Sequence, residues 1–158
     1  MNIGSVSIFQ PSDSGFEHET LVKLIKERLA FVPRYRQRVK AIPLGMFRPV
    51  WVDDTAFDVS YHVRRSALPK PGNAEQLDEL VARLMSRPLD RSRPLWEMYL
   101  IEGLSGGRFA IVTKSHEAMV DGLAALDISQ VILDSESQAS AGPPDSWRPA
   151  TEPSGIEL

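Results

Sequence analysis

The residues best suited to chemistry in this chain lie in the segment Ile111–Leu126, which reads "IVTKSHEAMVDGLAAL". An apolar strand is predicted to end and a helix to begin within it, with His116, Glu117 and Asp121 between them and Gly122 at the turn into the helix. Polar side chains at such junctions can point into a cleft while rigid elements hold them. The segment is therefore the candidate for acid–base chemistry, because an imidazole exchanges protons near neutral pH.

A purely structural interpretation fits the same residues. Asp121 could cap the helix that follows it, and His116 could be a half-buried histidine at the end of the strand. A single histidine with an aspartate five residues later is a weak pattern. The spacing alone therefore favours the structural interpretation over a catalytic one.

Composition narrows the classes of function. The 158-residue chain has no cysteine, which excludes disulfides, thiolate metal sites and a cysteine nucleophile. Its histidines, His18, His62 and His116, are too scattered to predict a metal site. A net charge of −3 argues against nucleic acid as a partner, since phosphate contacts need an excess of Lys and Arg. No apolar run reaches the length of a membrane span and no signal-peptide pattern opens the chain, so a cytoplasmic location is expected.

Apolar periodicity predicts strands and helices in an α+β arrangement rather than a doubly wound sheet. The expected elements are a strand over Asn2–Gln10, a helix over Glu17–Ala30, a short helix from Pro33, strands over Pro49–Val52 and Tyr61–Arg65, a helix over Ala74–Ser86 capped near Asn73, strands over Leu95–Glu102 and Arg108–Thr113, and a helix over Gly122–Leu133. The last two strands flank the Gly-rich turn "GLSGG", which predicts a hairpin. Residues 1–133 are expected to form one domain, and the Ser- and Pro-rich residues 134–158 a linker or disordered tail.

Several other conspicuous residues are interpreted structurally. The basic residues between Arg34 and Lys40 are expected to form a solvated or ion-paired face rather than an anion site. Trp96, Tyr99 and Leu100 are expected to fill a core rather than to line a lipid channel, and His62 to be a strand residue rather than a ligand.

Longer stretches of the sequence resemble the N-terminal half of the bacterial wax ester synthase/diacylglycerol acyltransferase family, a branch of the coenzyme A-dependent acyltransferase superfamily. The stretches are "VPRYRQRV", "RPVWVDD", "FDVSYHVRR", "SRPLDRSRPLWEMYLIEGL" and "RFAIVTKSH", in the family's order, and "WRPATEPSG" resembles its interdomain linker. "SHEAMVDG" resembles the family motif His-His-x-x-x-Asp-Gly. The resemblance implies half of a chloramphenicol acetyltransferase-like fold.

This motif departs from the family pattern at one position. His116 falls on the first histidine, while Glu117 replaces the second, which the family uses as general base. Asp121 and Gly122 match the remaining positions, and the resemblance implies that this aspartate supports the loop and the glycine keeps the turn tight. Nothing in the chain corresponds to the family's C-terminal half, so we expect a missing half or a partner chain to complete the site.

The activity implied by the resemblance is transfer of an acyl group from acyl-CoA, as co-substrate and without a bound cofactor, to diacylglycerol or a long-chain alcohol. Three interpretations of the motif stay open: Glu117 as a substitute base with a pKa raised by burial, His116 as a substitute base, or a non-catalytic binding module. The resemblance also suggests contact with membrane or lipid-droplet surfaces, and an uncovered apolar face predicts self-association.

We predict that Asp121→Ala lowers stability more than it lowers the rate of chemistry. An aspartate at a loop and helix start acts as a cap, and losing a cap costs about 0.5–2 kcal/mol. Thermal melts and single-turnover rates of the variant, compared at a temperature where both proteins are folded, check this. A normal melt with a lost chemical step would contradict it.

Overall fold

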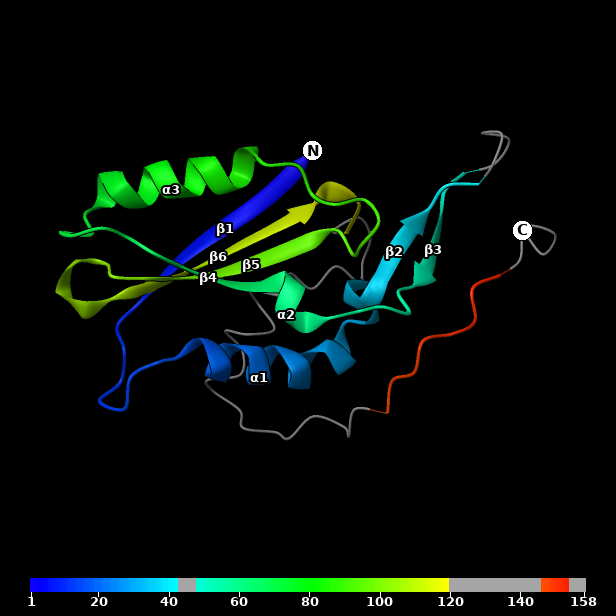
Figure 1. Cartoon of the computed structure of the whole chain (residues 1–158), viewed down its shortest axis with the longest axis horizontal. Helices are drawn as coiled ribbons and strands as arrows, with labels where there is room; N and C mark the ends of the chain where they lie inside the picture. Colours follow the sequence, from blue (N-terminus) through cyan, green and yellow to red (C-terminus); the bar gives the residue numbers. More distant parts are fainter. Residues whose placement is uncertain (43–47, 120–145, 154–158) are drawn as a thin grey trace.

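The computed structural model describes residues 1–42, 48–119 and 146–153. Its main sheet has four strands in the order β1-β6-β5-β4, with a helix on each face, and a two-stranded sheet stands beside it (Figure 1). The elements are β1 (Asn2–Phe9), α1 (His18–Arg28), β2 (Gln37–Lys40), β3 (Val50–Asp53), α2 (Val59–His62), β4 (Val63–Ala67), α3 (Ala74–Ser86), β5 (Trp96–Glu102) and β6 (Phe109–His116), with 3-10 turns over Leu29–Phe31, Pro33–Arg36, Ser105–Gly107 and Glu117–Met119. The expected α+β class is confirmed.

Strand β5 forms the centre of the core, because both of its faces are covered. Trp96, Met98 and Leu100 belong to the apolar cluster on the α1 side, whereas Tyr99 and Ile101 belong to the cluster on the α3 side. None of the five side chains is more than 5% exposed. Burying one large apolar side chain contributes about 1.5–3 kcal/mol. The prediction that Trp96, Tyr99 and Leu100 fill a core is therefore confirmed.

The pairing of the strands combines a hairpin with a crossover. β5 and β6 pair antiparallel across the Gly-rich turn, which confirms the predicted hairpin, and β1 pairs antiparallel with the other side of β6. β4 and β5 run parallel, so the chain crosses between them through α3. This order puts the carboxyl end of β6, which carries His116, beside the start of β5.

Helix α3 is fixed at both ends by side chains. Asn73 accepts a hydrogen bond from the Gln76 backbone N–H, and the Gln76 side chain accepts one from the Asn73 N–H, at 2.9 Å each. This capping box confirms the predicted cap. At the other end, the ammonium of Lys114 on β6 donates to the Leu84 carbonyl at 2.8 Å and to the Arg87 carbonyl. β6 therefore holds the last turn of α3.

The predicted strand over Tyr61–Arg65 is wrong at its beginning. Tyr61 and His62 lie in the helical turn α2, and extended backbone starts only at Val63. The carboxylate of Asp58 accepts from the Ser60 N–H at 2.9 Å and so caps the turn. His62 is therefore a buried residue at the end of a helix and not a strand residue.

The sequence also concealed strand β2. The short helix predicted from Pro33 is confirmed over Pro33–Arg36, but the chain then extends and pairs with β3, which is the strand predicted over Pro49–Val52. Arg38 and Lys40 obscured the strand pattern. Both form ion pairs with Glu152, so the expected ion-paired face is confirmed for these two residues.

Residues 146–153, which we call the bracing segment, lie against the β2–β3 hairpin. The Ala150 N–H donates to the Asp53 carboxylate at 2.8 Å, and Glu152 pairs with both Arg38 and Lys40. The Trp147 ring meets the Phe57 ring edge-on, with centroids 6.4 Å apart. The hairpin is thus held by backbone and side-chain contacts of a segment far away in sequence. The predicted helix over Gly122–Leu133 and the rest of residues 134–158 lie outside the described residues.

The imidazole of His62 lies in an apolar setting. It is fully buried, its Nδ1–H donates to the Trp96 carbonyl at 2.7 Å, and its ring stacks on the Trp96 ring with centroids 4.6 Å apart. Within the described part of the chain, no group bonds to its Nε2. Burial lowers the pKa of His62 below its ordinary value, since a proton on Nε2 would place a charge there without a partner.

We predict that the free energy of unfolding falls as the pH drops from about 6.5 toward 5. The folded pKa of His62 is lowered, so the unfolded chain binds the proton first, and stability present above pH ~6.5 is lost below it. His62→Phe keeps a ring in the stack and should reduce this slope. Urea titrations at several pH values measure it, and an unchanged slope in the variant would assign the effect to other groups.

A second prediction concerns the bracing segment. Glu152→Gln removes the charge that pairs with Arg38 and Lys40, and partly exposed pairs of this kind contribute about 0.2–1 kcal/mol each. We expect a small loss of stability and faster proteolysis within the bracing segment. Glu79→Gln on the exposed face of α3 changes the same charge without breaking an ion pair and serves as the control. Equal behaviour of the two variants would show that the pairs contribute nothing.

Candidate functional site

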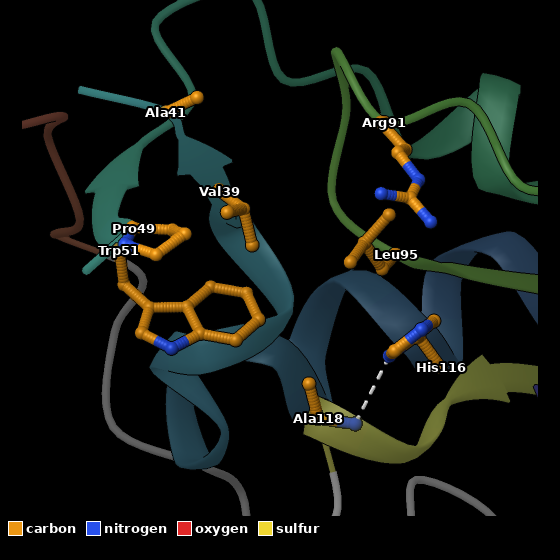
Figure 2. A pocket seen from close by; sticks show the side chains of 8 residues that line it. All are labelled: Val39, Ala41, Pro49, Trp51, Arg91, Leu95, His116 and Ala118. Carbon is orange, nitrogen blue, oxygen red and sulfur yellow. Dashed lines mark hydrogen bonds between the residues drawn. The ribbon is translucent and has the colours of Figure 1, made fainter. Parts of the chain in front are cut away.

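A cleft of about 510 Å³ lies between the β2–β3 hairpin and the ends of β5 and β6 (Figure 2). Among the described residues its lining is mostly apolar, and an arginine and a histidine are the only charged or titratable side chains there. The lining residues are Val39, Ala41, Pro49, Trp51, Arg91, Leu95, His116 and Ala118. The cleft therefore suits a ligand that is largely apolar and carries one reactive or charged group.

His116 reaches the cleft because β6 is longer than predicted. The strand was expected to end near Lys114, but its pairing with β1 continues to His116. The His116 backbone N–H donates to the Leu95 carbonyl at 3.0 Å, which fixes the residue beside the start of β5. A rigid strand end thus positions the imidazole, as expected of a functional side chain.

The hydrogen bonds of His116 set the position of its ring proton. Its Nδ1 lies 3.1 Å from the backbone nitrogen of Ala118, the bond drawn in Figure 2. A backbone N–H can only donate, so Nδ1 accepts and the neutral ring carries its proton on Nε2. In this conformation the ring is a hydrogen-bond donor through Nε2. To take a proton there, it must first shift its own proton to Nδ1 and release Ala118.

Glu117 lies outside the cleft. Its side chain is 52% exposed, and its carboxylate accepts from the N-terminal amine of Met1 at 2.9 Å. The same amine lies 3.4 Å from Nε2 of His116. An ammonium can only donate, so with the ring proton on Nε2 this approach is not a hydrogen bond. The hydrogen bond and charge of the Met1 amine hold the pKa of Glu117 below its ordinary value. The burial that was expected to raise this pKa is therefore not found, and the expectation is corrected.

Of the four predicted site residues, the structure describes His116 and Glu117. His116 and Glu117 are adjacent, yet only His116 lines the cleft. Asp121 and Gly122 lie outside the described residues. The turn that leads toward them ends at Met119, whose side chain is 5% exposed and anchored in the cluster on the α1 side.

Sequence reasoning missed the wall opposite His116. Val39 and Trp51 come from β2 and β3, and their role depends on a strand pairing that the sequence did not reveal. Arg91 was also missed, since arginines are common in exposed loops. The Arg-rich stretch around it gave no signal that its side chain meets a cleft.

Two other properties bear on the kind of site. Among the described residues, no group of three or more His, Cys, Asp or Glu side chains could hold a metal ion. In the same residues, no helix has both the length and the apolar character needed to cross a membrane.

Comparisons with known proteins identify relatives of the whole chain. A probable diacylglycerol O-acyltransferase of Mycobacterium tuberculosis, tgs3, is 51% identical over 158 residues, which are 100% of this chain and 58% of that protein. A second from the same organism, tgs2, is 41% identical, and the match covers 97% of this chain and 35% of that protein. The chain thus spans little more than half the length of tgs3.

Solved structures share the fold. A wax ester synthase/diacylglycerol acyltransferase from Marinobacter aquaeolei matches with a TM-score of 0.65 and 32% identity, over 82% of this chain and 32% of that one. The starter condensation domain of rhizomide synthetase matches with a TM-score of 0.61 at 13% identity, over 83% of this chain and 31% of that one. The second likeness shows the fold alone.

Nearly the whole chain matches one family model. The model of the wax ester synthase/diacylglycerol acyltransferase catalytic domain matches residues 1–157. The match includes the strand end that carries His116 and both strands of the hairpin wall. This chain therefore belongs to the wax ester synthase/diacylglycerol acyltransferase family.

Proposed function

We propose that this chain supplies the His116 side of an acyl-CoA-dependent O-acyltransferase, which transfers a fatty acyl group to diacylglycerol or a long-chain alcohol. The product is a triacylglycerol or a wax ester. The observation that carries the proposal is a mostly apolar cleft whose lining includes one group able to exchange a proton near neutral pH, His116. Family membership supports the reaction class.

The reaction needs a base because an alcohol is a poor nucleophile at neutral pH. The base takes the hydroxyl proton while the alcohol oxygen attacks the thioester carbonyl. The tetrahedral intermediate then collapses, the carbon–sulfur bond breaks, and the departing thiolate takes the proton to become free CoA. No metal, oxidant or reductant is required for this balance.

We assign the role of base to His116 rather than to Glu117. His116 lines the cleft, whereas Glu117 is exposed and its pKa is lowered, which makes it a weaker base. The assignment requires a tautomer change in the ring. When Nδ1 gives up the Ala118 N–H and takes the ring proton, Nε2 becomes free to accept the proton of the alcohol.

A second candidate function is binding of acyl ligands without turnover. The observation that favours it is the same hydrogen bond, because a ring held with its proton on Nε2 cannot act as a base at that atom. In this case the chain would be a binding or interaction module, and the replacement of the family's second histidine by Glu117 would mark the loss of catalysis.

The partners we propose follow from the chemistry of these substrates. Acyl-CoA is the donor and no resident cofactor takes part. Diacylglycerol and long-chain alcohols partition into lipid, so the protein is proposed to work at the surface of a membrane or lipid droplet. Because the chain spans 58% of tgs3, further residues of the site are proposed to come from a region that corresponds to the rest of that relative.

We predict that His116→Ala lowers acyl transfer by roughly 100-fold to 10,000-fold, the usual contribution of a general base. Glu117→Gln and Glu117→His should both change the rate little, because the Glu117 side chain lies outside the cleft. The assay follows CoA released from palmitoyl-CoA with diacylglycerol or hexadecanol as acceptor. It uses the chain joined to the C-terminal region of a relative.

His18→Gln is the matched control, because His18 lies on α1, its Nε2–H donates to the Val63 carbonyl at 2.9 Å, and it does not line the cleft. Its rate should equal that of the parent. If Glu117→Gln abolishes an activity that His116→Ala leaves intact, Glu117 is the base and the assignment is wrong. If all variants remain folded, bind palmitoyl-CoA and release no CoA, the binding function replaces the catalytic one.

A further inference from the structure

Arg91 is the one permanently charged side chain among the described residues that line the cleft. Figure 2 shows its guanidinium extended toward Leu95 and His116, across the cleft from Val39 and Trp51. Arginine stays protonated at any physiological pH, and its donors match the oxygens of a phosphate or carboxylate. The cleft thus presents a cation beside an apolar wall.

The charge of Arg91 is not neutralised by its neighbours in the loop. The carboxylate of Asp90 accepts from the Ser92 N–H at 2.9 Å and the Ser92 hydroxyl at 2.7 Å, and it lies 3.7 Å from the Arg93 guanidinium. Arg93 also stacks over the Tyr61 ring, 4.0 Å from its centroid. Across the described residues, no carboxylate pairs with Arg91 and no ring lies over it.

The loop also holds Arg91 in place. A tight turn holds this part of the chain. It is closed by a hydrogen bond from the Arg93 N–H to the Asp90 carbonyl, at 3.2 Å, and by the hydrogen bonds between Asp90 and Ser92. Arg91 follows the first residue of this turn, so its side chain projects from a fixed backbone. A guanidinium on a fixed turn loses less freedom on binding an anion than one on a flexible loop.

We infer that Arg91 forms an anion subsite of the cleft that binds the phosphate groups of acyl-CoA. The inference rests on the proposed function for the identity of the ligand. The apolar wall of Val39, Trp51 and Leu95 takes the acyl chain, and Arg91 takes the charged part of the donor. A neutral acceptor alcohol gains nothing from this contact, so Arg91 separates the donor from the acceptor by charge.

The test measures binding of ligands to the 158-residue chain by isothermal titration calorimetry, without any turnover. The probes are palmitoyl-CoA, palmitoyl-N-acetylcysteamine as a neutral thioester without phosphate, palmitate, and hexadecanol. The variants are Arg91→Gln and Arg91→Lys. Arg83→Gln is the matched control, because Arg83 is an exposed arginine on α3 that does not line the cleft.

We expect Arg91→Gln to weaken binding of palmitoyl-CoA by roughly 10-fold to 100-fold, the loss of a hydrogen-bonded charge contact. Affinity for the neutral thioester and for hexadecanol should not change. The affinity of Arg91→Lys for palmitoyl-CoA should lie between those of the parent chain and Arg91→Gln. Added salt should weaken palmitoyl-CoA binding to the parent chain more than to Arg91→Gln. Arg83→Gln should behave like the parent.

Three results would overturn the inference. If Arg91→Gln lost as much affinity for the neutral thioester as for palmitoyl-CoA, Arg91 would contribute packing to the cleft and not an anion contact. Loss for palmitate but not for palmitoyl-CoA would assign the subsite to a carboxylate, and no change for any probe would remove the subsite. The proposed function fails separately: palmitoyl-CoA binding that depends on Arg91, with no CoA release in the joined protein, would keep the subsite and reject the transferase.

Discussion

The buried indole of Trp96 connects the β2–β3 hairpin side of the cleft to the core. It is 1% exposed, its Nε1–H donates to the Tyr35 carbonyl at 2.7 Å, and its ring meets the Tyr35 ring edge-on and stacks on His62. Tyr35 lies two residues before β2, so the Trp96 side chain links the β2–β3 hairpin and α2 to the central strand. The opening between Trp51 and His116 therefore depends on a contact made in the core, away from either residue.

The sequence predicted the parts of the fold that depend on local patterns. The β5–β6 hairpin follows from two apolar runs around a Gly-rich turn, and α3 follows from its apolar face and its Asn73 cap. Pairing between β2 and β3 could not be predicted, because Arg38 and Lys40 interrupt the apolar pattern and find their partner, Glu152, more than 100 residues later. Local patterns carry no information about such contacts.

The candidate site shows the same division. The position of His116 at the end of a strand could be predicted, since the apolar run before it is clear. Which of His116 and Glu117 faces the cleft could not be predicted. Neighbouring side chains of an extended chain point in opposite directions, and a shift of one residue in the pairing register exchanges them. The hairpin wall and Arg91 join the site only through the tertiary structure.

Under the proposed function, the amines of this protein would meet activated thioesters and could be acylated. Lys114, two residues before His116, is 1% exposed, and its ammonium donates hydrogen bonds to the Leu84 and Arg87 carbonyls. Burial lowers the pKa of Lys114, which by itself would favour the neutral, nucleophilic amine. The Lys114 side chain is buried and does not line the cleft, so under the proposed function it is kept away from the acyl donor. The contact that secures the end of α3 would then also protect this lysine from acylation.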